Sequence, residues 1–450
     1  MDRKHPLREH PLREIVRMQK SGIPMGIYSA CTANDYVIEA VMERARERNE
    51  YVLIEATANQ VNQFGGYTGM TPEDFKEFVY AIAKKVDFPV DMIILGGDHL
   101  GPLTWKNEKA AEAMEKSVEL VRQYVLAGFT KIHIDTSMHL GDDNKEKRLD
   151  TEIIAERGAV LCSEAERAFA QLKEVNPNAV QPVYVVGSEV PIPGGSQDED
   201  EGIQVTKVED FEETVETFKN AFLKHNLNNA WENVVAIVVQ PGVEFGDDTI
   251  HEYSRESAKE LCKALKKYPN LVFEGHSTDY QTAEALKQMV EDGIAILKVG
   301  PALTFALREG LFALNHIENE LFRYNPDIIL SNFINVLDDC MAKNPKYWKS
   351  HYHGNGSKIR IARKYSLSDR CRYYLPLKEV RESLELMISN LRSTKIPLTL
   401  ISAFMPLQYR KIRNGLLKND PEALLKDRIV DCIDDYLYAV TPGNALENAR

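Results

Sequence analysis

The chain has 450 residues, of which 44% are hydrophobic and 27% are charged, and its formal net charge at pH 7 is −13. This length favours one large domain with a smaller one, because a single hydrophobic core stops growing near about 250–300 residues. The acidic balance argues against a nucleic-acid partner, since binding to a phosphate backbone requires a basic face. The sequence shows no long apolar segment and no signal peptide, so we expect a cytoplasmic protein without membrane contact.

The first part of the chain, residues 1–24, contains a tandem His-Pro-Leu-Arg-Glu at positions 5–9 and 10–14. Two copies are too few for a solenoid, so we interpret this segment as a surface helix that continues through Met18. From residue 25 to residue 318, short apolar stretches alternate with amphipathic ones. This alternation is typical of parallel strands joined by crossover helices.

Eight strand-then-helix units can be counted in this region. The predicted strands are 26–29, 51–55, a third that ends at 98–99, then 131–135, 182–189, 234–240, 271–276 and 295–300. Helices are predicted at 35–48, after an N-cap at Thr71, and at 151–175. Eight units favour a TIM (β/α)8 barrel over an open doubly wound sheet, which usually has fewer strands. We therefore predict an α/β fold with a barrel over residues 25–318.

The alternation stops after residue 318, and helices are predicted at 333–341, 377–391 and 422–438. Residues 319–450 thus form an all-helical extension, expected to pack on the barrel or on a neighbouring subunit. The run from His351 to Gly356 contains two histidines. We interpret it as a mobile, solvated turn, because metal sites rarely rest on two ligands in a flexible segment.

Polar residues collect at the predicted strand ends, where the active site of a TIM barrel lies. His99 and His276 end the third and seventh strands, and Glu189 ends the fifth. These three side chains could hold a divalent metal ion with one position open for a substrate oxygen, although a strand-end histidine is often only a packing residue. Asp98 is either a general acid/base beside that ion or a cap for the segment after Pro102.

Further strand-end and loop residues complete the predicted site. Asp98, Glu189 and Asp135 are the candidate catalytic carboxylates, and the candidate substrate-binding residues are Glu55, Asn59, Gln240, Ser277, Asp279, Lys298 and Gly300. The loop 55–70 is rich in amides and glycines, which suits recognition of sugar hydroxyls and closure over a ligand, or else describes an ordinary surface loop.

A phosphate site is predicted from the loops after the seventh and eighth strands. The pattern Thr278-x-x-Gln281 resembles a capping box, which would place a helix N-terminus at the barrel mouth. Residues 299–302 offer a second approach of the backbone, and phosphate commonly binds between these two loops in this fold. A kinase is not indicated, because the chain has no G-x-x-x-x-G-K-[ST] phosphate loop.

Several long stretches carry a resemblance to one known family. They are residues 54–70, 95–102 (Leu-Gly-Gly-Asp-His-Leu-Gly-Pro), 187–191, 239–245, 276–282, 297–309 and 365–370. Together they resemble the Z-type subunit of class II D-tagatose-1,6-bisphosphate aldolase, from about Ile15 to the end of the helical tail. The duplicated N-terminus is the main departure from the family pattern.

The resemblance implies two alternative functions. One is a metal-dependent epimerase that acts at C4 of free ketohexoses or their 6-phosphates and interconverts fructose and tagatose forms. The other is a non-catalytic accessory subunit that a catalytic Y-type aldolase subunit needs for activity and stability. We favour the enzyme, because a purely structural role predicts erosion of the barrel mouth, which here keeps Asp, His, Glu and Gln together.

The resemblance also assigns roles to single residues. His99 and His276 are similar to zinc ligands of the catalytic class II aldolases, and Asp98 is similar to their acid/base. Their third histidine has no placed counterpart, so Glu189 is expected to be the third ligand. The expected cofactor is a divalent ion, Zn²⁺ first and Mn²⁺, Co²⁺, Ni²⁺ or Mg²⁺ as alternatives. We also expect a homo-oligomer.

Overall fold

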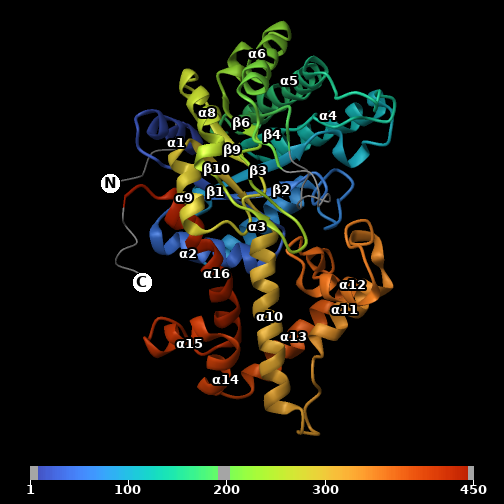
Figure 1. Ribbon diagram of the computed structural model, residues 1–450, viewed down its shortest axis with the longest axis vertical. Coiled ribbons are helices and arrows are strands. Elements are labelled where there is room, and N and C mark those ends of the chain that lie inside the picture. The colour runs from blue at the N-terminus through green and yellow to red at the C-terminus, as the bar shows by residue number, and fades with distance from the viewer. Residues whose placement is uncertain (1–8, 191–202, 444–450) are drawn as a thin grey trace.

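The computed structural model describes residues 9–190 and 203–443 of the chain. The first copy of the N-terminal repeat, apart from its last residue, and most of the loop rich in Pro, Gly and Asp before Gly202 lie outside these ranges. Figure 1 shows a barrel surrounded by helices, with a second group of helices below it. Among the described helices, none combines the length and the apolar character that a membrane crossing requires.

Eight parallel strands close into a barrel, which confirms the predicted TIM fold. In barrel order the strands run β1-β10-β9-β6-β5-β4-β3-β2 and back to β1. Their bounds are β1 Ile27–Cys31, β2 Val52–Thr57, β3 Ile93–Leu100, β4 Lys131–Ile134, β5 Val183–Val186, β6 Val234–Val239, β9 Val272–Gly275 and β10 Ile294–Val299. Two short strands, β7 Glu244–Phe245 and β8 Ile250–His251, form a separate antiparallel pair after β6.

Helices follow the strands and cover the outside of the barrel. They are α2 Asp35–Arg48, α3 Pro72–Lys85, α4 Ala110–Ala127, α5 Thr151–Val175, α6 Val208–Lys224, α7 Asn228–Trp231, α8 Arg255–Ala264, α9 Ala283–Glu291 and α10 Pro301–Phe322. Short 3₁₀ turns are η1 Val90–Met92, η2 Pro102–Trp105 and η3 Leu265–Lys267. Helix α3 begins at the predicted N-cap Thr71, which forms a capping box with Asp74.

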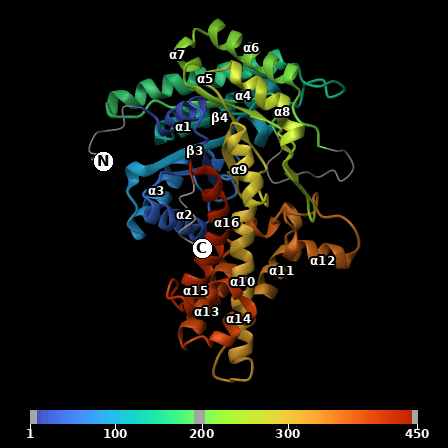
Figure 2. The same ribbon diagram turned by 60° about the vertical axis from the view of Figure 1, so that its left-hand side comes forward.

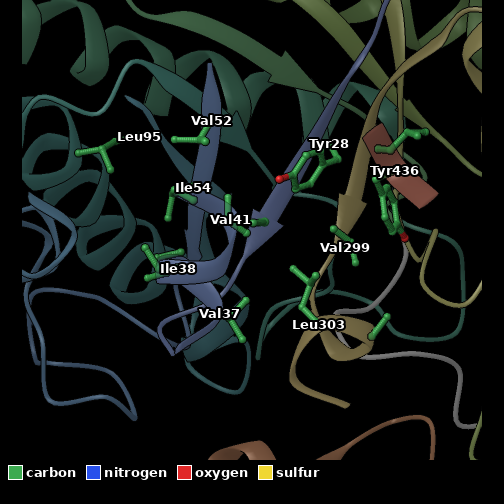
Figure 3. Close-up of a cluster of buried hydrophobic side chains, with 14 of the residues drawn as sticks. Tyr28, Val37, Ile38, Val41, Val52, Ile54, Leu95, Val299, Leu303 and Tyr436 are labelled. Carbon is green, nitrogen blue, oxygen red and sulfur yellow. The ribbon is translucent and has the colours of Figure 1, made fainter. Parts of the chain in front are cut away.

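The main core lies between the strands and these helices. The strands are buried along nearly their whole length, as parallel strands covered on both faces must be. Figure 3 shows this packing where Val37, Ile38 and Val41 of α2 lie beside Val52 and Ile54 of β2. Apolar side chains therefore fill the outer layer, and the inside of the barrel is free to carry polar groups at its C-terminal end.

Helix α1, Pro11–Lys20, covers the other end of the barrel. Its residues Leu12, Ile15 and Val16 are buried and share a small core with the first residues of the strands, such as Ile27 and Leu53. The predicted surface helix is thus present and runs through Met18, and it buries one face against the barrel. An apolar stripe on the helix closes the N-terminal end of the barrel.

The C-terminal extension grows out of the last barrel helix. It contains α11 Phe333–Lys343, η4 Pro345–Tyr347, α12 Gly356–Tyr365, η5 Arg370–Tyr373, α13 Lys378–Arg392, α14 Leu398–Phe404, α15 Pro406–Arg413 and α16 Pro421–Val440. Helix α10 continues well beyond the barrel, and α16 runs back alongside it (Figures 1 and 2). The carbonyl of Val440 accepts the N–H of Gly26 at 3.0 Å, which ties the end of α16 to β1.

Candidate metal centre

Three histidines converge at the C-terminal end of the barrel. His99 belongs to β3, His133 to β4, and His276 directly follows β9. Their ring centroids lie 4.9 to 5.1 Å from one another, and all three side chains are buried. His99 has a left-handed backbone with φ of 47°, a costly conformation that is found preferentially at functional sites.

Each imidazole holds one ring nitrogen against a carboxylate. Nδ1 of His99 lies 2.8 Å from Asp135, Nδ1 of His133 lies 2.8 Å from Asp98, and Nε2 of His276 lies 3.0 Å from Glu274. Such carboxylate–histidine pairs fix the orientation of the ring and raise its basicity, and they accompany most metal-binding histidines. The arrangement is therefore that of an oriented ligand set.

The donor set fits a metal ion. Asp98, His99, His133 and His276 can each offer one ligand atom, and these four atoms all lie within 4.8 Å of one another. Nε2 of His133 is buried and has no hydrogen-bond partner in the described part of the chain. Nitrogen and carboxylate oxygen are the ligands that Zn²⁺ and the neighbouring divalent transition ions prefer.

Two lysines and two glutamates join this centre in one buried charged network. Lys298 contacts Asp98 at 2.6 Å and also contacts Glu55. Lys131 contacts Glu55 and Glu274, each at 2.7 Å, and Glu274 leads back to His276. We call this chain of contacts, from Asp98 to Glu274, the charged network.

The charges inside the barrel do not balance by themselves. The carboxylates are Asp98, Asp135, Glu55 and Glu274, and the ammonium groups are Lys131 and Lys298. Two negative charges remain when the three imidazoles are neutral, and buried net charge is costly unless it is compensated. A divalent cation would supply this compensation.

The protonation states agree with a cation-binding role. Burial lowers the pKa of His276 to about 3, so its imidazole is neutral and can act as a ligand. Burial alone would raise the pKa of Asp98, but His99, Lys298 and His133 hold it well below its ordinary value. Burial alone would lower the pKa of His99, yet Asp98 and Asp135 raise it, which shows how strongly this spot attracts positive charge.

A cavity of about 350 Å³ opens over the centre. The predicted site residues that line it are Asn59, Asp98, His99, His276, Ser277, Asp279, Lys298 and Gly300. This volume is at the lower end of the range for small-molecule pockets, about 300–1,000 Å³. The structure thus brings together eight of the predicted residues around one space.

Four predicted residues lie elsewhere. Glu189 follows the end of β5 and pairs with Arg148 at 2.9 Å, outside the group of residues that could hold a metal ion, so its prediction as a ligand is corrected. The side chain of Gln240 accepts the N–H groups of Gly242 and Val243, which makes it a turn residue. Glu55 and Asp135 are buried beneath the cavity, where each holds another site residue rather than a substrate.

The predicted phosphate site also differs from the structure. Helix α9 is capped by Thr282, while the hydroxyl of Thr278 donates to the carbonyl of Lys298, so the predicted capping box does not form. At the start of α10, Oδ1 of Asp279 accepts the N–H groups of Gly300 at 3.0 Å and Ala302 at 2.8 Å. A carboxylate therefore already occupies donors that a phosphate would use.

Sequence reasoning missed two sets of residues. His133, Lys131 and Glu274 lie inside the barrel, and the available signal was polar residues at alternate positions of strands that are otherwise apolar. The second set lines the same cavity from the C-terminal extension and consists of His351, Arg370, Arg372 and Tyr373; Lys106, which follows η2 of the barrel, also lines it. His351 is thus part of the cavity wall, although its run was interpreted as a solvated turn.

Comparisons with known proteins agree over almost the whole chain. A family model described as D-tagatose-1,6-bisphosphate aldolase subunit GatZ/KbaZ-like matches residues 12–441. Two relatives named D-tagatose-1,6-bisphosphate aldolase subunit GatZ, from Salmonella agona and Klebsiella pneumoniae, are 47% and 46% identical over 434 residues, covering 96% of this chain and 100% of each relative. A solved structure described as a probable tagatose 6 phosphate kinase from Sinorhizobium meliloti 1021 is also similar, with a TM-score of 0.84 and 42% identity over 92% of this chain and 100% of that chain.

Proposed function

This chain belongs to the D-tagatose-1,6-bisphosphate aldolase subunit GatZ/KbaZ-like family, and on that premise we propose that it is a Z-type aldolase subunit with a metal-dependent ketose-phosphate site of its own. The subunit role is supported by relatives that bear this name and that match 96% of this chain over their own full length. The presence of a working site is supported by one observation above all. Three histidines, each paired with a carboxylate, converge with Asp98 under a cavity.

A divalent ion held by His99, His133 and His276 would polarise the carbonyl or hydroxyl oxygen of a ketose, with Zn²⁺ as the first candidate. Asp135 and Glu274 keep the rings of His99 and His276 in place, so the ligand set is preorganised. Asn59 lines the cavity, and its amide can bind sugar hydroxyls.

Asp98 is the candidate for moving a proton. Its carboxylate is ionised, so it can accept one. In this structure one carboxylate oxygen contacts His133 at 2.8 Å and the other contacts Lys298 at 2.6 Å. Lys298 lines the cavity as well, and its ammonium group would stabilise an oxyanion that develops beside Asp98.

The second candidate function is C4 epimerisation by this chain without a partner. It is favoured by the same pair, Asp98 and Lys298, because an accessory subunit needs neither an ionised base nor an ammonium group at a cavity wall. Inversion at C4 conserves composition, whether a proton leaves and returns or the C3–C4 bond is cleaved and formed again. Fructose 6-phosphate and tagatose 6-phosphate are then substrate and product of one another.

The experiment uses the purified full chain loaded with Zn²⁺, and in parallel with Mn²⁺, Co²⁺, Ni²⁺ or Mg²⁺. One arm supplies fructose 6-phosphate and follows tagatose 6-phosphate by NMR. The other arm adds a Y-type aldolase subunit and follows cleavage of tagatose 1,6-bisphosphate. Both arms compare the natural chain with His276→Ala, and with His316→Ala, which removes an exposed histidine of α10 outside the cavity.

We expect metal to co-purify with the natural chain and with His316→Ala, and to be lost from His276→Ala. Turnover in the first arm that requires His276 supports the epimerase. Activation of the Y-type subunit by the natural chain but not by His276→Ala supports a subunit that depends on its own site. Equal activation by His276→Ala, with no turnover in the first arm, would leave only a structural role and refute the proposed site.

A further inference from the structure

The wall of the cavity that faces the barrel comes from the C-terminal extension. Arg370 and Arg372, on the 3₁₀ turn η5, line the same cavity as His99 and His276. The barrel therefore supplies the floor with the candidate metal ligands, and the C-terminal extension supplies two guanidinium groups. Neither guanidinium group has a role in the metal-dependent chemistry proposed for the barrel floor.

The turn that carries the two arginines is held rigidly. Asp369 has a left-handed backbone with φ of 46°, and its side chain accepts hydrogen bonds from Thr304 at 2.6 Å and Arg308 at 3.4 Å, both on α10. On the other side, one oxygen of Asp247 accepts the hydroxyls of Ser366 at 2.8 Å and Ser368 at 3.1 Å. These contacts fix the turn against the barrel, so the guanidinium groups are preorganised.

Neither guanidinium has a carboxylate partner in the described part of the chain. Arg370 is only 5% exposed, and it donates to Tyr373 and to His351, while its Nε is buried without a partner. Arg372 donates to the main-chain carbonyls of Ser368 and Asp369 and to the hydroxyl of Tyr373. All of these acceptors are neutral.

Such an arrangement is costly without an anion. A buried cation loses its hydration, and neutral acceptors replace it only in part. The electrostatic effect is visible at Tyr373, whose hydroxyl accepts from both arginines. Burial alone would raise the pKa of this phenol, but Arg372 and Arg370 lower it. Arg370, which is buried, and Arg372, which is partly exposed, both line the cavity without an ion-pair partner in the described part of the chain, so they mark a place for a bound anion.

The usual anion site of this fold is less open here. Oδ1 of Asp279 holds the N–H groups of Gly300 and Ala302 at the start of α10. A phosphate there would meet a carboxylate instead of free donors. The cations of the opposite wall, Arg370 and Arg372, with the exposed Lys106 at the rim, are the alternative.

We propose that Arg370 and Arg372 bind the terminal phosphate of a phosphorylated ketose whose carbonyl end lies over the metal centre. Planar guanidinium groups match the oxygens of a phosphate with paired hydrogen bonds. This inference rests on the proposed function for the identity of the sugar, and it adds that the site selects phosphorylated over free ketoses. The extension thereby becomes the specificity-determining part of the site.

The first test measures binding of inorganic phosphate to the full chain by calorimetry, without any turnover. The variants are Arg372→Gln and Arg370→Lys. The first removes the charge of a partly exposed residue, and the second keeps the charge but loses the planar guanidinium group. Arg360→Gln is the matched control, because Arg360 is an exposed arginine of α12 outside the cavity. Fructose 6-phosphate and free fructose are added as competitors.

We expect phosphate to bind the natural chain and Arg360→Gln equally, and to bind each cavity variant about 10-fold or more weakly, the usual effect of losing hydrogen bonds to a charged group. Fructose 6-phosphate should displace phosphate and fructose should not. Absence of phosphate binding to the natural chain, or equal affinity in Arg372→Gln and Arg370→Lys, would overturn the proposal. The binding measurement tests the phosphate site even if the chain has no turnover.

The second test applies once turnover is measured. In Arg372→Gln, kcat/KM for fructose 6-phosphate should fall about 10-fold or more while kcat/KM for free fructose stays the same, because only the phosphorylated sugar loses a contact. Arg372→Lys should recover part of the loss. An equal fall for both sugars would show a structural role for Arg372 and overturn the assignment, while the metal-dependent function itself would stand.

Discussion

Replacing Asp279 by asparagine should change how stability depends on pH while the fold stays intact. Asp279 is 3% exposed, and a single oxygen, Oδ1, accepts the N–H groups of both Gly300 and Ala302. Asparagine presents one carbonyl oxygen at the same place, so it can accept both hydrogen bonds. The substitution therefore removes the titration of this group and keeps its contacts.

The sign and the size of the effect follow from the pKa. Burial raises the pKa of Asp279 from 3.8 to about 6. Between these two values the folded protein binds a proton that the unfolded chain does not, so this stabilisation is present at low pH and is lost as the pH rises through about 6. From pH 5 to pH 7 the loss is about 1.4 kcal/mol, because one pH unit separates pH 5 from the raised pKa.

The assay compares urea-unfolding free energies of the natural chain and of Asp279→Asn at pH 5, 6 and 7. The natural chain should lose about 1.4 kcal/mol relative to the variant over this range. Asp327→Asn makes the same chemical change at an exposed position and should leave the pH dependence unaltered. A difference between natural chain and Asp279→Asn that does not vary with pH would mean that Asp279 stays ionised, and the reasoning from burial would fail.

Two further changes test the metal centre and the charges beneath it. Asp135→Asn should weaken Zn²⁺ binding about 10–100-fold, because the carboxylate that orients His99 is lost. Competition with a chromophoric chelator measures the affinity for Zn²⁺. An unchanged affinity would contradict the orienting role of Asp135. Lys131→Met should lower the free energy of unfolding by about 3–5 kcal/mol, because it leaves Glu55 and Glu274 without their shared cation. Denaturant titration measures this loss, and adding Glu274→Gln should restore part of it; a loss below about 1 kcal/mol would show that the charged network is not coupled through Lys131.

The barrel could be predicted from the sequence because its signals are local. Helices α2 and α5 were predicted at about Asp35–Arg48 and Thr151–Val175, where the structure has them, since each has an apolar stripe and a polar residue before its first turn. The eight strands were found because each is a short apolar run followed by a polar residue. The family resemblance carried by the motifs between them is confirmed by the family match over residues 12–441.

The candidate metal centre was predicted only in part, because the direction in which a side chain points depends on where its strand ends. His99 and His276 were identified as strand-end residues and do lie in the ligand group. Glu189 was chosen by the same rule, but β5 ends at Val186, and the residues beyond it turn toward Arg148. His133 lies within β4, two residues from Lys131, so both side chains face the barrel interior.

The arginine wall could not be predicted from local patterns. Helix α10 carries the extension away from the barrel. Arg370 and Arg372 reach the cavity because the neighbouring Asp369 accepts hydrogen bonds from Thr304 and Arg308, near the start of that helix. No periodicity in the sequence encodes a contact between a barrel helix and a turn some 60 residues later. The polar residues that make this contact look like ordinary loop residues in the sequence.

The charged network bears on whether the chain could be a scaffold alone. Its members Glu55, Lys131 and Glu274 are fully buried, and a buried ion network is often less stable than apolar residues of the same volume, by about 1–4 kcal/mol. A subunit with a purely structural role would gain stability by losing these charges. Their contacts end at Asp98 on one side and at His276 on the other, both in the ligand group. This loss of stability has a functional reason if the network sets the charge and the orientation of the candidate metal centre.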